Sequence, residues 1–196
     1  GADRAVAPMS GAETIDFPPP VGQAEAIYTL HSEVAMFPRS FPGLRHASFK
    51  VAFAPEFTAK LRFLVSLGLA SREPLGGDSP EAAVVPRRVL LALAARQATP
   101  SGDPTDCDVL RVDAIGTKDG RRVKARAESV ILPHPVWKVA AGSLDTGVPL
   151  SVVGQMLARR EIRAPGVHCP ERGVPHEPFF EALAHRGIVV RLDGPH

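Results

Sequence analysis

The side chains best suited to proton transfer lie close together near the start of this sequence. Thr29, His31 and Glu33 occupy alternate positions, so a strand continued from residue 23 to residue 33 would present all three on one polar face. Imidazole exchanges protons near neutral pH, and a carboxylate beside it favours its charged form. The spacing therefore predicts an acid–base pair with a hydroxyl next to it. The alternative is an ordinary half-exposed histidine among residues common in strands.

Other positions could hold the anionic groups of a ligand. Arg39 and Lys50 could clamp carboxylates, and the planar guanidinium suits a bidentate grip. Thr146-Gly147 stands where an apolar helical pattern starts, and the free N–H groups of a helix start favour an anion. Simpler alternatives remain open: solvated surface charges for Arg39 and Lys50, and a plain N-cap for Thr146.

Several familiar motifs of nucleotide binding and hydrolysis are absent from the sequence. It contains no GxGxxG turn, no GxxxxGK phosphate loop, no GxSxG elbow and no HExxH helix. Without a dinucleotide-binding turn, the chain is not expected to be a complete redox enzyme. His168 and Cys169 lie near His176, but no CxxC or HxxxH accompanies them, so we expect a loop with a reduced thiol and no metal.

Composition narrows the class of protein further. The 23 Lys and Arg residues nearly balance 21 Asp and Glu, no long basic run occurs, and aromatic residues make up only 6%. Nucleic-acid binding needs a clustered basic surface, so we do not expect that function. Two cysteines are too few for a disulfide scaffold. We find no signal peptide and no membrane-spanning run, and the expected compartment is the cytoplasm.

Periodicity and turn residues predict the elements of the first half of the chain. Strands are expected at 13–17, at 23–31 (or to 33 if the alternation continues) and at 44–53, with a turn-rich crossing at 36–43 between the last two. A helix follows Pro55, which suits the first helical position. A second helix is expected at about 80–97, with its firm part after Pro86.

The second half of the chain carries the clearest local signal. Asp119-Gly120 is a strong hairpin turn and predicts a β-hairpin at about 107–132. Helices are expected at 145–160 and from Pro178 to a cap at Gly187, followed by a strand at 188–192.

These elements mix without a regular βαβ alternation, which favours an α+β fold. We expect a mixed β-sheet with helices packed largely on one face. Residues 1–11 have no periodicity and are expected to be a linker or a cut edge. Residues 12–196 are then one domain.

Three stretches of the sequence together resemble one known family. AIYTLHSE at 26–33 is followed by Pro38-Arg39 and by the segment 48–57. LDTGVP at 144–149 leads to QMLAR at 155–159, and 166–171 leads to PFFEALA at 178–184. In this order they resemble the C-terminal domain of the saccharopine dehydrogenase-like oxidoreductases, over roughly residues 12–190. That family includes saccharopine reductases and enzymes similar to lysine 6-dehydrogenase and carboxynorspermidine dehydrogenase.

The resemblance implies a function and partners. The family transfers hydride between NAD or NADP and the amine-bearing carbon of an amino acid or polyamine of the saccharopine or lysine type. Its N-terminal Rossmann domain binds most of the cofactor and is missing from this chain, so that domain is an expected partner. The C-terminal domain supplies part of the substrate site and often the dimer contact, so a homodimer is expected.

For this reaction, the chemistry of the candidate residues suggests a role for each. They are His31 and Glu33 in catalysis, Thr29, Arg39 and Lys50 in substrate binding, and Thr146 and Gly147 in cofactor binding. This chain alone is expected to be inactive. The alternative function is a stand-alone ligand-binding or oligomerisation module without catalysis.

Overall fold

The computed structural model describes residues 4–76, 83–97 and 103–194. Within these ranges the strands form two separate three-stranded sheets, and every pairing between neighbouring strands is antiparallel. The predicted α+β class is confirmed. The strands are divided between two sheets, where a single mixed sheet was expected.

The first sheet consists of β1 (Glu13–Asp16), β2 (Gln23–Tyr28) and β3 (Lys50–Ala52), with β2 in the centre. Ala26 pairs with Glu13 on one side and with Ala52 on the other. The segment before β1 also adheres to this sheet, because the N–H of Tyr28 donates to the carbonyl of Ser10 at 3.0 Å. Ala26 and Ile27 are buried and anchor this part of the chain.

The strand predicted to continue to residue 33 is wrong beyond Tyr28, and so is the crossing predicted at 36–39. Helix α1 (Ser32–Ser40) occupies this segment, and β3 is much shorter than the strand expected at 44–53. Pro38 lies in the last turn of α1, where its missing N–H costs one hydrogen bond. Glu33 in the first turn and Arg39 in the last complement the helix dipole, which supports a helix despite the proline.

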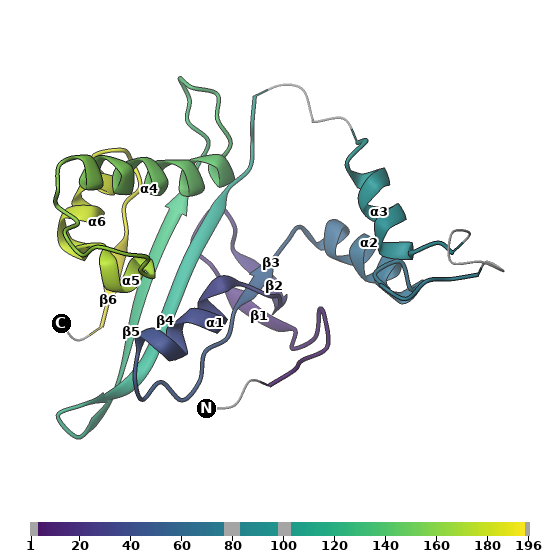
Figure 1. The fold of residues 1–196 in the computed structure, drawn as a ribbon, viewed down its shortest axis with the longest axis horizontal. Helices are drawn as coiled ribbons and strands as arrows, with labels where there is room; N and C mark the ends of the chain where they lie inside the picture. The colour runs from purple at the N-terminus through teal and green to yellow at the C-terminus, as the bar shows by residue number, and fades with distance from the viewer. Residues whose placement is uncertain (1–3, 77–82, 98–102, 195–196) are drawn as a thin grey trace.

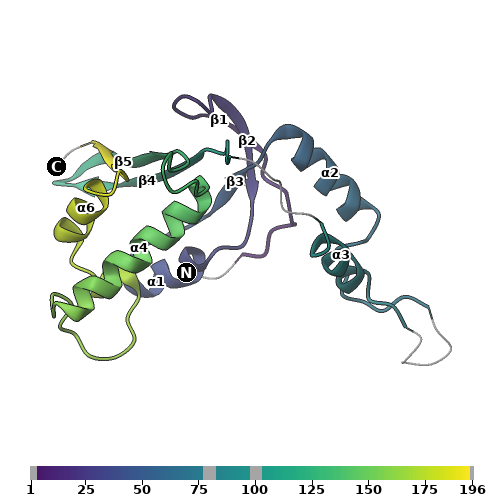
Figure 2. The same cartoon turned by 90° about the horizontal axis from the view of Figure 1, so that it is seen from above.

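Helices α2 (Pro55–Ser66) and α3 (Pro86–Ala94) both begin with proline, as predicted. Figures 1 and 2 show them side by side at one end of the molecule, away from the other helices. The apolar side chains of α2 are only partly covered, since Phe57 is 52% exposed. The part of the predicted second helix at 80–82 lies outside the described residues.

The second sheet contains β4 (Asp108–Lys118), β5 (Arg121–Ile131) and the short β6 (Arg191–Asp193). Its hairpin is confirmed: Asp119 and Gly120 have φ of 51° and 74°, the pair of positive values that a type I′ turn requires. Register pairs Ala114 with Ala125 and Asp113 with Arg126. Side chains alternate, so one face is apolar and the other charged.

Helix α4 (Ala141–Ala158) packs on α6 (His176–Ala184) and on β5, with the one-turn α5 (Pro170–Gly173) beside them. In Figure 1 these helices lie together on one side of the second sheet. They enclose the main core, which comprises Ile131, Ala141, Leu144, Val152, Met156, Leu183 and Ile188. The cap predicted at Gly187 is confirmed by its φ of 81° and by the N–H of Ile188 donating to Leu183.

The chain exposes far more surface than a self-contained domain. Its accessible surface is 15054 Å², whereas a compact monomer of 20.8 kDa exposes about 9,000 Å². Large apolar side chains contribute to this excess, among them Leu30 (92% exposed), Val136 (78%) and Leu192 (68%). Exposed apolar surface on this scale indicates contact with another protein surface.

None of the described helices is both long and apolar enough to cross a membrane.

Candidate functional site

The candidate site lies where β2 gives way to α1. The strand ends at Tyr28, and two extended residues lead to His31, the N-cap residue of α1. The backbone of His31 is extended (φ −141°, ψ 158°), and its side chain does not cap the helix. The imidazole is therefore available for other contacts.

The structure brings His31 and Glu33 together, although by a helix start and not along a strand face. His31 Nδ1 contacts Glu33 Oε2 directly, and the hydroxyl of Ser32 donates to the same oxygen at 3.2 Å. The imidazole also stacks on the ring of Phe49, with centroids 4.1 Å apart and planes inclined by 13°. A carboxylate on one edge and an aromatic ring on one face fix the orientation of the imidazole.

This arrangement determines which imidazole nitrogen can react. An ionised carboxylate only accepts hydrogen bonds, so Nδ1 of His31 carries the proton. In the neutral ring Nε2 is then unprotonated and can accept a proton, and no partner for it is found in the described part of the chain. The side chains of His31 and Glu33 are 45% and 38% exposed, so a substrate can reach them. The pair has the geometry of a general base held by a carboxylate.

Of the predicted substrate-binding residues, Thr29 and Lys50 lie beside this pair. The N–H of Thr29 donates to the carbonyl of Phe49 at 3.4 Å, which places Phe49 against His31. Lys50 already has partners: its Nζ lies 2.6 Å from Glu13 Oε2 and 4.8 Å from the centre of the Tyr28 ring. Lys50 on β3 is therefore linked to Glu13 on β1, across the first sheet, and its ammonium group is less available for the carboxylate of a substrate.

Arg39 is not brought to the same place. It lies in the last turn of α1, about 12 Å along the helix axis from His31 at 1.5 Å per residue. Its side chain is exposed. Two contacts from the C-terminal region hold this helix, Cys169 Sγ to Met36 Sδ at 3.6 Å and Glu171 to Ser40. Residues distant in sequence thus hold the middle and the C-terminal end of α1.

The helix start predicted at Thr146-Gly147 is wrong. Helix α4 begins earlier, at Ala141, so Thr146 lies in its second turn and its hydroxyl donates to the carbonyl of Gly142 at 2.9 Å. The N–H of Gly142 is capped by Asp106 from another part of the chain, at 3.3 Å. The sequence near 140 contains no local cap, which is why the earlier start was missed.

Negative charge gathers at the true start of α4. Burial raises the pKa of Asp108, and the nearby carboxylates of Asp145 and Asp106 raise it further. A phosphate would be repelled by these side chains. The residues around Thr146 and Gly147 therefore do not fit the phosphates of NAD or NADP. Burial, with help from Asp108 and Asp106, also raises the pKa of the Cys107 thiol, which is unsuited to act as a nucleophile.

The residues suspected of metal binding have other contacts. His168 Nε2 lies 2.8 Å from the carbonyl of Pro165, and Cys169 faces Met36. Within residues 4–76, 83–97 and 103–194, no group of three or more His, Cys, Asp or Glu side chains is placed to hold a metal ion.

Two contributors to the candidate site were not predicted. Phe49 was placed only as part of a strand, and Ser32 was passed over. Phe49 reaches His31 through the pairing of β2 with the segment before β3, a contact that no local pattern reveals. The alternation of Phe49 with Lys50 was the available signal, since it puts the two side chains on opposite faces.

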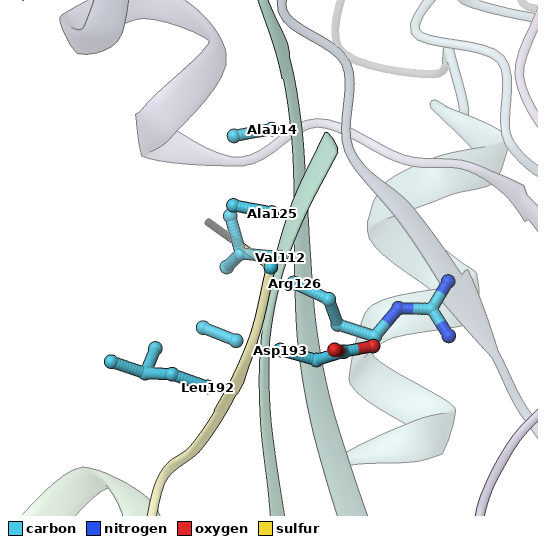
Figure 3. A pocket seen from close by; sticks show the side chains of 8 residues that line it. Val112, Ala114, Ala125, Arg126, Leu192 and Asp193 are labelled. Atoms are coloured by element: carbon cyan, nitrogen blue, oxygen red, sulfur yellow. The ribbon is translucent and has the colours of Figure 1, made fainter. Parts of the chain in front are cut away.

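A second feature is a hollow of about 170 Å³ on the apolar face of the second sheet. Figure 3 shows Val112, Ala114, Ala125 and Leu192 on one side of the sheet, with the Arg126 guanidinium and Asp193 carboxylate on the other. The α4–α6 helices cover the end of this face near Ile131 and leave the end near the hairpin turn open. This open half is an apolar surface and not a catalytic centre.

Together, the fold and the His31–Glu33 contact define an α+β domain with a histidine–carboxylate pair that is open to solvent. Residues 5–188 match the family described as the saccharopine dehydrogenase C-terminal domain. The chain therefore belongs to that family, and the resemblance inferred from its sequence is confirmed. The family forms part of saccharopine dehydrogenase-like oxidoreductases, which generally use NAD(P).

Proposed function

We propose that this domain forms the substrate side of an NAD(P)-dependent oxidoreductase acting on the CH–NH group of an amino acid or polyamine of the saccharopine or lysine type. The observation that carries the proposal is the His31–Glu33 pair, with Nδ1 held and Nε2 free, in a domain of this family. NAD(P) supplies or accepts the hydride when bound. The residues of this chain manage the proton and the substrate.

In the proposed reaction, His31 Nε2 takes the proton from the substrate amine as the imine forms, and returns it in the reverse direction. Glu33 keeps the imidazole oriented through its contact with Nδ1. Phe49 covers one face of the ring and excludes water from it. Thr29 lines the approach to His31.

Arg39 and Lys50 have different places in the proposal. A carboxylate bound by Arg39 belongs to an extended substrate, because Arg39 lies about 12 Å along α1 from His31. Lys50 binds a carboxylate only if it leaves Glu13. The proposed cofactor role of Thr146 and Gly147 rests on the family resemblance alone. Any such contact would be to a part of NAD(P) other than its phosphates, because the carboxylates near the start of α4 repel phosphate.

The exposed surface supports two protein partners. A nucleotide-binding domain would close the open side of the His31–Glu33 pair and hold the cofactor. A second copy of this chain would cover the apolar half of the second sheet around Val112, Ala125 and Leu192, giving a homodimer. A standard interface buries about 1,600 Å² in total, and the excess surface of about 6,000 Å² is sufficient for both contacts.

The free thiols of Cys107 and Cys169 favour a reducing compartment such as the cytoplasm.

The test is a pair of variants in the full-length protein, assayed for NAD(P)-dependent turnover with saccharopine and with lysine. His31→Asn removes Nε2, and we expect kcat/KM to fall about a hundredfold to ten-thousandfold, the usual contribution of a general base. Glu33→Gln keeps the histidine and should cost about tenfold, mostly in kcat. His185→Asn is the matched control, since His185 is exposed at the end of α6.

Equal activity of His31→Asn and His185→Asn would refute the role of His31. Absence of NAD(P)-dependent turnover on every amine, combined with binding of an amino acid measured by calorimetry, would favour the stand-alone ligand-binding module. The exposed apolar face of the second sheet is the observation that favours an oligomerisation role in that case.

A further inference from the structure

A second charged feature lies on α3, distant from the His31–Glu33 pair. A hollow of about 290 Å³ is lined by Arg72, Val85, Arg87, Arg88 and Leu91. We refer to it as the arginine hollow. Its size is near the lower end of about 300–1,000 Å³ typical of small-molecule sites. Three arginines and two apolar residues line it, and the arginines are exposed to solvent.

The position of two of these arginines opposes the usual preference of a helix. Arg87 and Arg88 lie in the first turn of α3, which contains no acidic residue. The start of a helix carries partial positive charge, so cations there are unfavourable and anions favourable. Among the residues that the structure describes, no carboxylate compensates this placement, and a local rule broken in this way marks a functional position more often than a structural one.

Arg72 is brought to the same hollow by the connection between α2 and α3. The N–H of Arg87 donates to the carbonyl of Ser71 at 3.0 Å, and Leu75 pairs with Val84. These contacts hold the segment with Arg72 against the first turn of α3. Within the described ranges, no ion pair is formed by Arg72, Arg87 or Arg88.

We propose that the arginine hollow binds the phosphate group of a small molecule. A phosphate group carries a charge of about −1.5 to −2 at neutral pH and accepts hydrogen bonds in several directions. A phosphate ligand therefore matches three arginines better than a carboxylate ligand would. Arginine binds phosphate in a bidentate manner. Val85 and Leu91 contact the uncharged part of the ligand. The site is independent of the proposed amine oxidation.

The test measures anion binding to the full-length protein by calorimetry, at an ionic strength matched with chloride. The probes are inorganic phosphate, pyrophosphate and phenyl phosphate, the last of which offers an apolar group to Val85 and Leu91. We expect saturable binding at one site, tightest for phenyl phosphate. Arg87→Gln and Arg88→Gln should each weaken it about tenfold, equivalent to about 1.4 kcal/mol.

Arg96→Gln is the matched control, because Arg96 follows the other end of α3 and does not line the hollow. It should leave binding unchanged, and circular dichroism of all variants checks that they fold. No saturable binding above the chloride background would overturn the proposal, and so would an equal loss in Arg96→Gln. Tighter binding of a single-stranded oligonucleotide, not competed by phosphate, would assign the surface to nucleic acid and overturn it as well.

Discussion

The two halves of this chain differ in how they are held together. Residues 108–194 surround the core formed by α4, α6 and β5, where Val152 and Met156 are almost completely buried. Residues 4–97 contain a small sheet and three helices with little enclosed by them. Apart from Ala26 and Ile27, the buried positions among the described residues of this half are Thr58 and Pro86.

The C-terminal half is stabilised by its own core, whereas the N-terminal half has few buried apolar side chains among its described residues. The C-terminal half is a scaffold that reaches across to α1 through Cys169 and Glu171. The N-terminal half contains the His31–Glu33 pair and the arginine hollow, but it lacks a core of its own. Apolar burial supplies most of the stabilisation of a fold. We therefore expect that a partner surface completes the N-terminal half.

The largest expected difference between the halves is in core truncation. Met156→Ala removes a fully buried side chain of the C-terminal half and should lower the free energy of unfolding by about 2–5 kcal/mol. Phe63→Ala in α2 removes an aromatic side chain from a residue that is 61% exposed. This substitution should change the free energy of unfolding by less than about 0.5 kcal/mol. Urea unfolding followed by circular dichroism measures both. Similar losses for the two variants would remove the distinction between the halves.

A smaller effect is expected at a strained position within the C-terminal half. Arg160 follows the C-cap residue of α4 and has φ of 59°, and the N–H of Glu161 donates to the carbonyl of Met156 in the arrangement usually completed by glycine. Arg160→Gly should raise the free energy of unfolding by about 1 kcal/mol, since a left-handed conformation costs other residues about 1–2 kcal/mol. The melting temperature should increase, and Arg159→Gly, in the preceding position, should decrease it.

The smallest effect concerns the outer part of the hairpin, where ion pairs replace a core. Arg126 donates to both carboxylate oxygens of Asp113, at 2.7 and 2.9 Å, and holds the pKa of Asp113 below its ordinary value. The folded state then binds this proton less readily than the unfolded chain, so the stabilisation is present above about pH 4 and is lost below it.

Asp113→Asn should therefore lower stability at pH 7 by less than about 1 kcal/mol, because the pair is about one-third exposed. The difference from the unmodified protein should shrink as the pH falls from 5 to 2, which denaturation at several pH values would measure. A difference that is independent of pH would contradict the role of the ion pair.

The features predicted correctly from the sequence depend on local chemistry. The turn at Asp119-Gly120 follows from the positive φ that these residues tolerate, and α2 and α3 follow from prolines at their first positions. The start of α4 depends on Asp106, far away in sequence, and could not be predicted from local residues. Helix α1 replaced a predicted strand because contacts with Cys169 and Glu171 outweigh the alternation.

The contact between His31 and Glu33 was predicted, but from a strand alternation that the structure does not contain. His31 and Glu33 meet as expected, but they do so across the start of α1, and Thr29 lies on the extended segment before it. Stacking of Phe49 on His31 depends on strand pairing between distant residues. Arg39 is separated from the pair because residues 36–39 continue α1 along its axis, where a turn was predicted.

The measurement that tests the dependence of the N-terminal half on a partner most directly is hydrogen–deuterium exchange. It compares this chain alone with the full-length protein, which we propose also contains a nucleotide-binding domain. We predict that the amides of α1, α2 and α3 exchange rapidly in the isolated chain and become strongly protected in the full-length protein, while those of β5 and α4 are protected in both. Equal protection of α1–α3 in the two samples would show that the N-terminal half needs no partner, and would contradict the proposal.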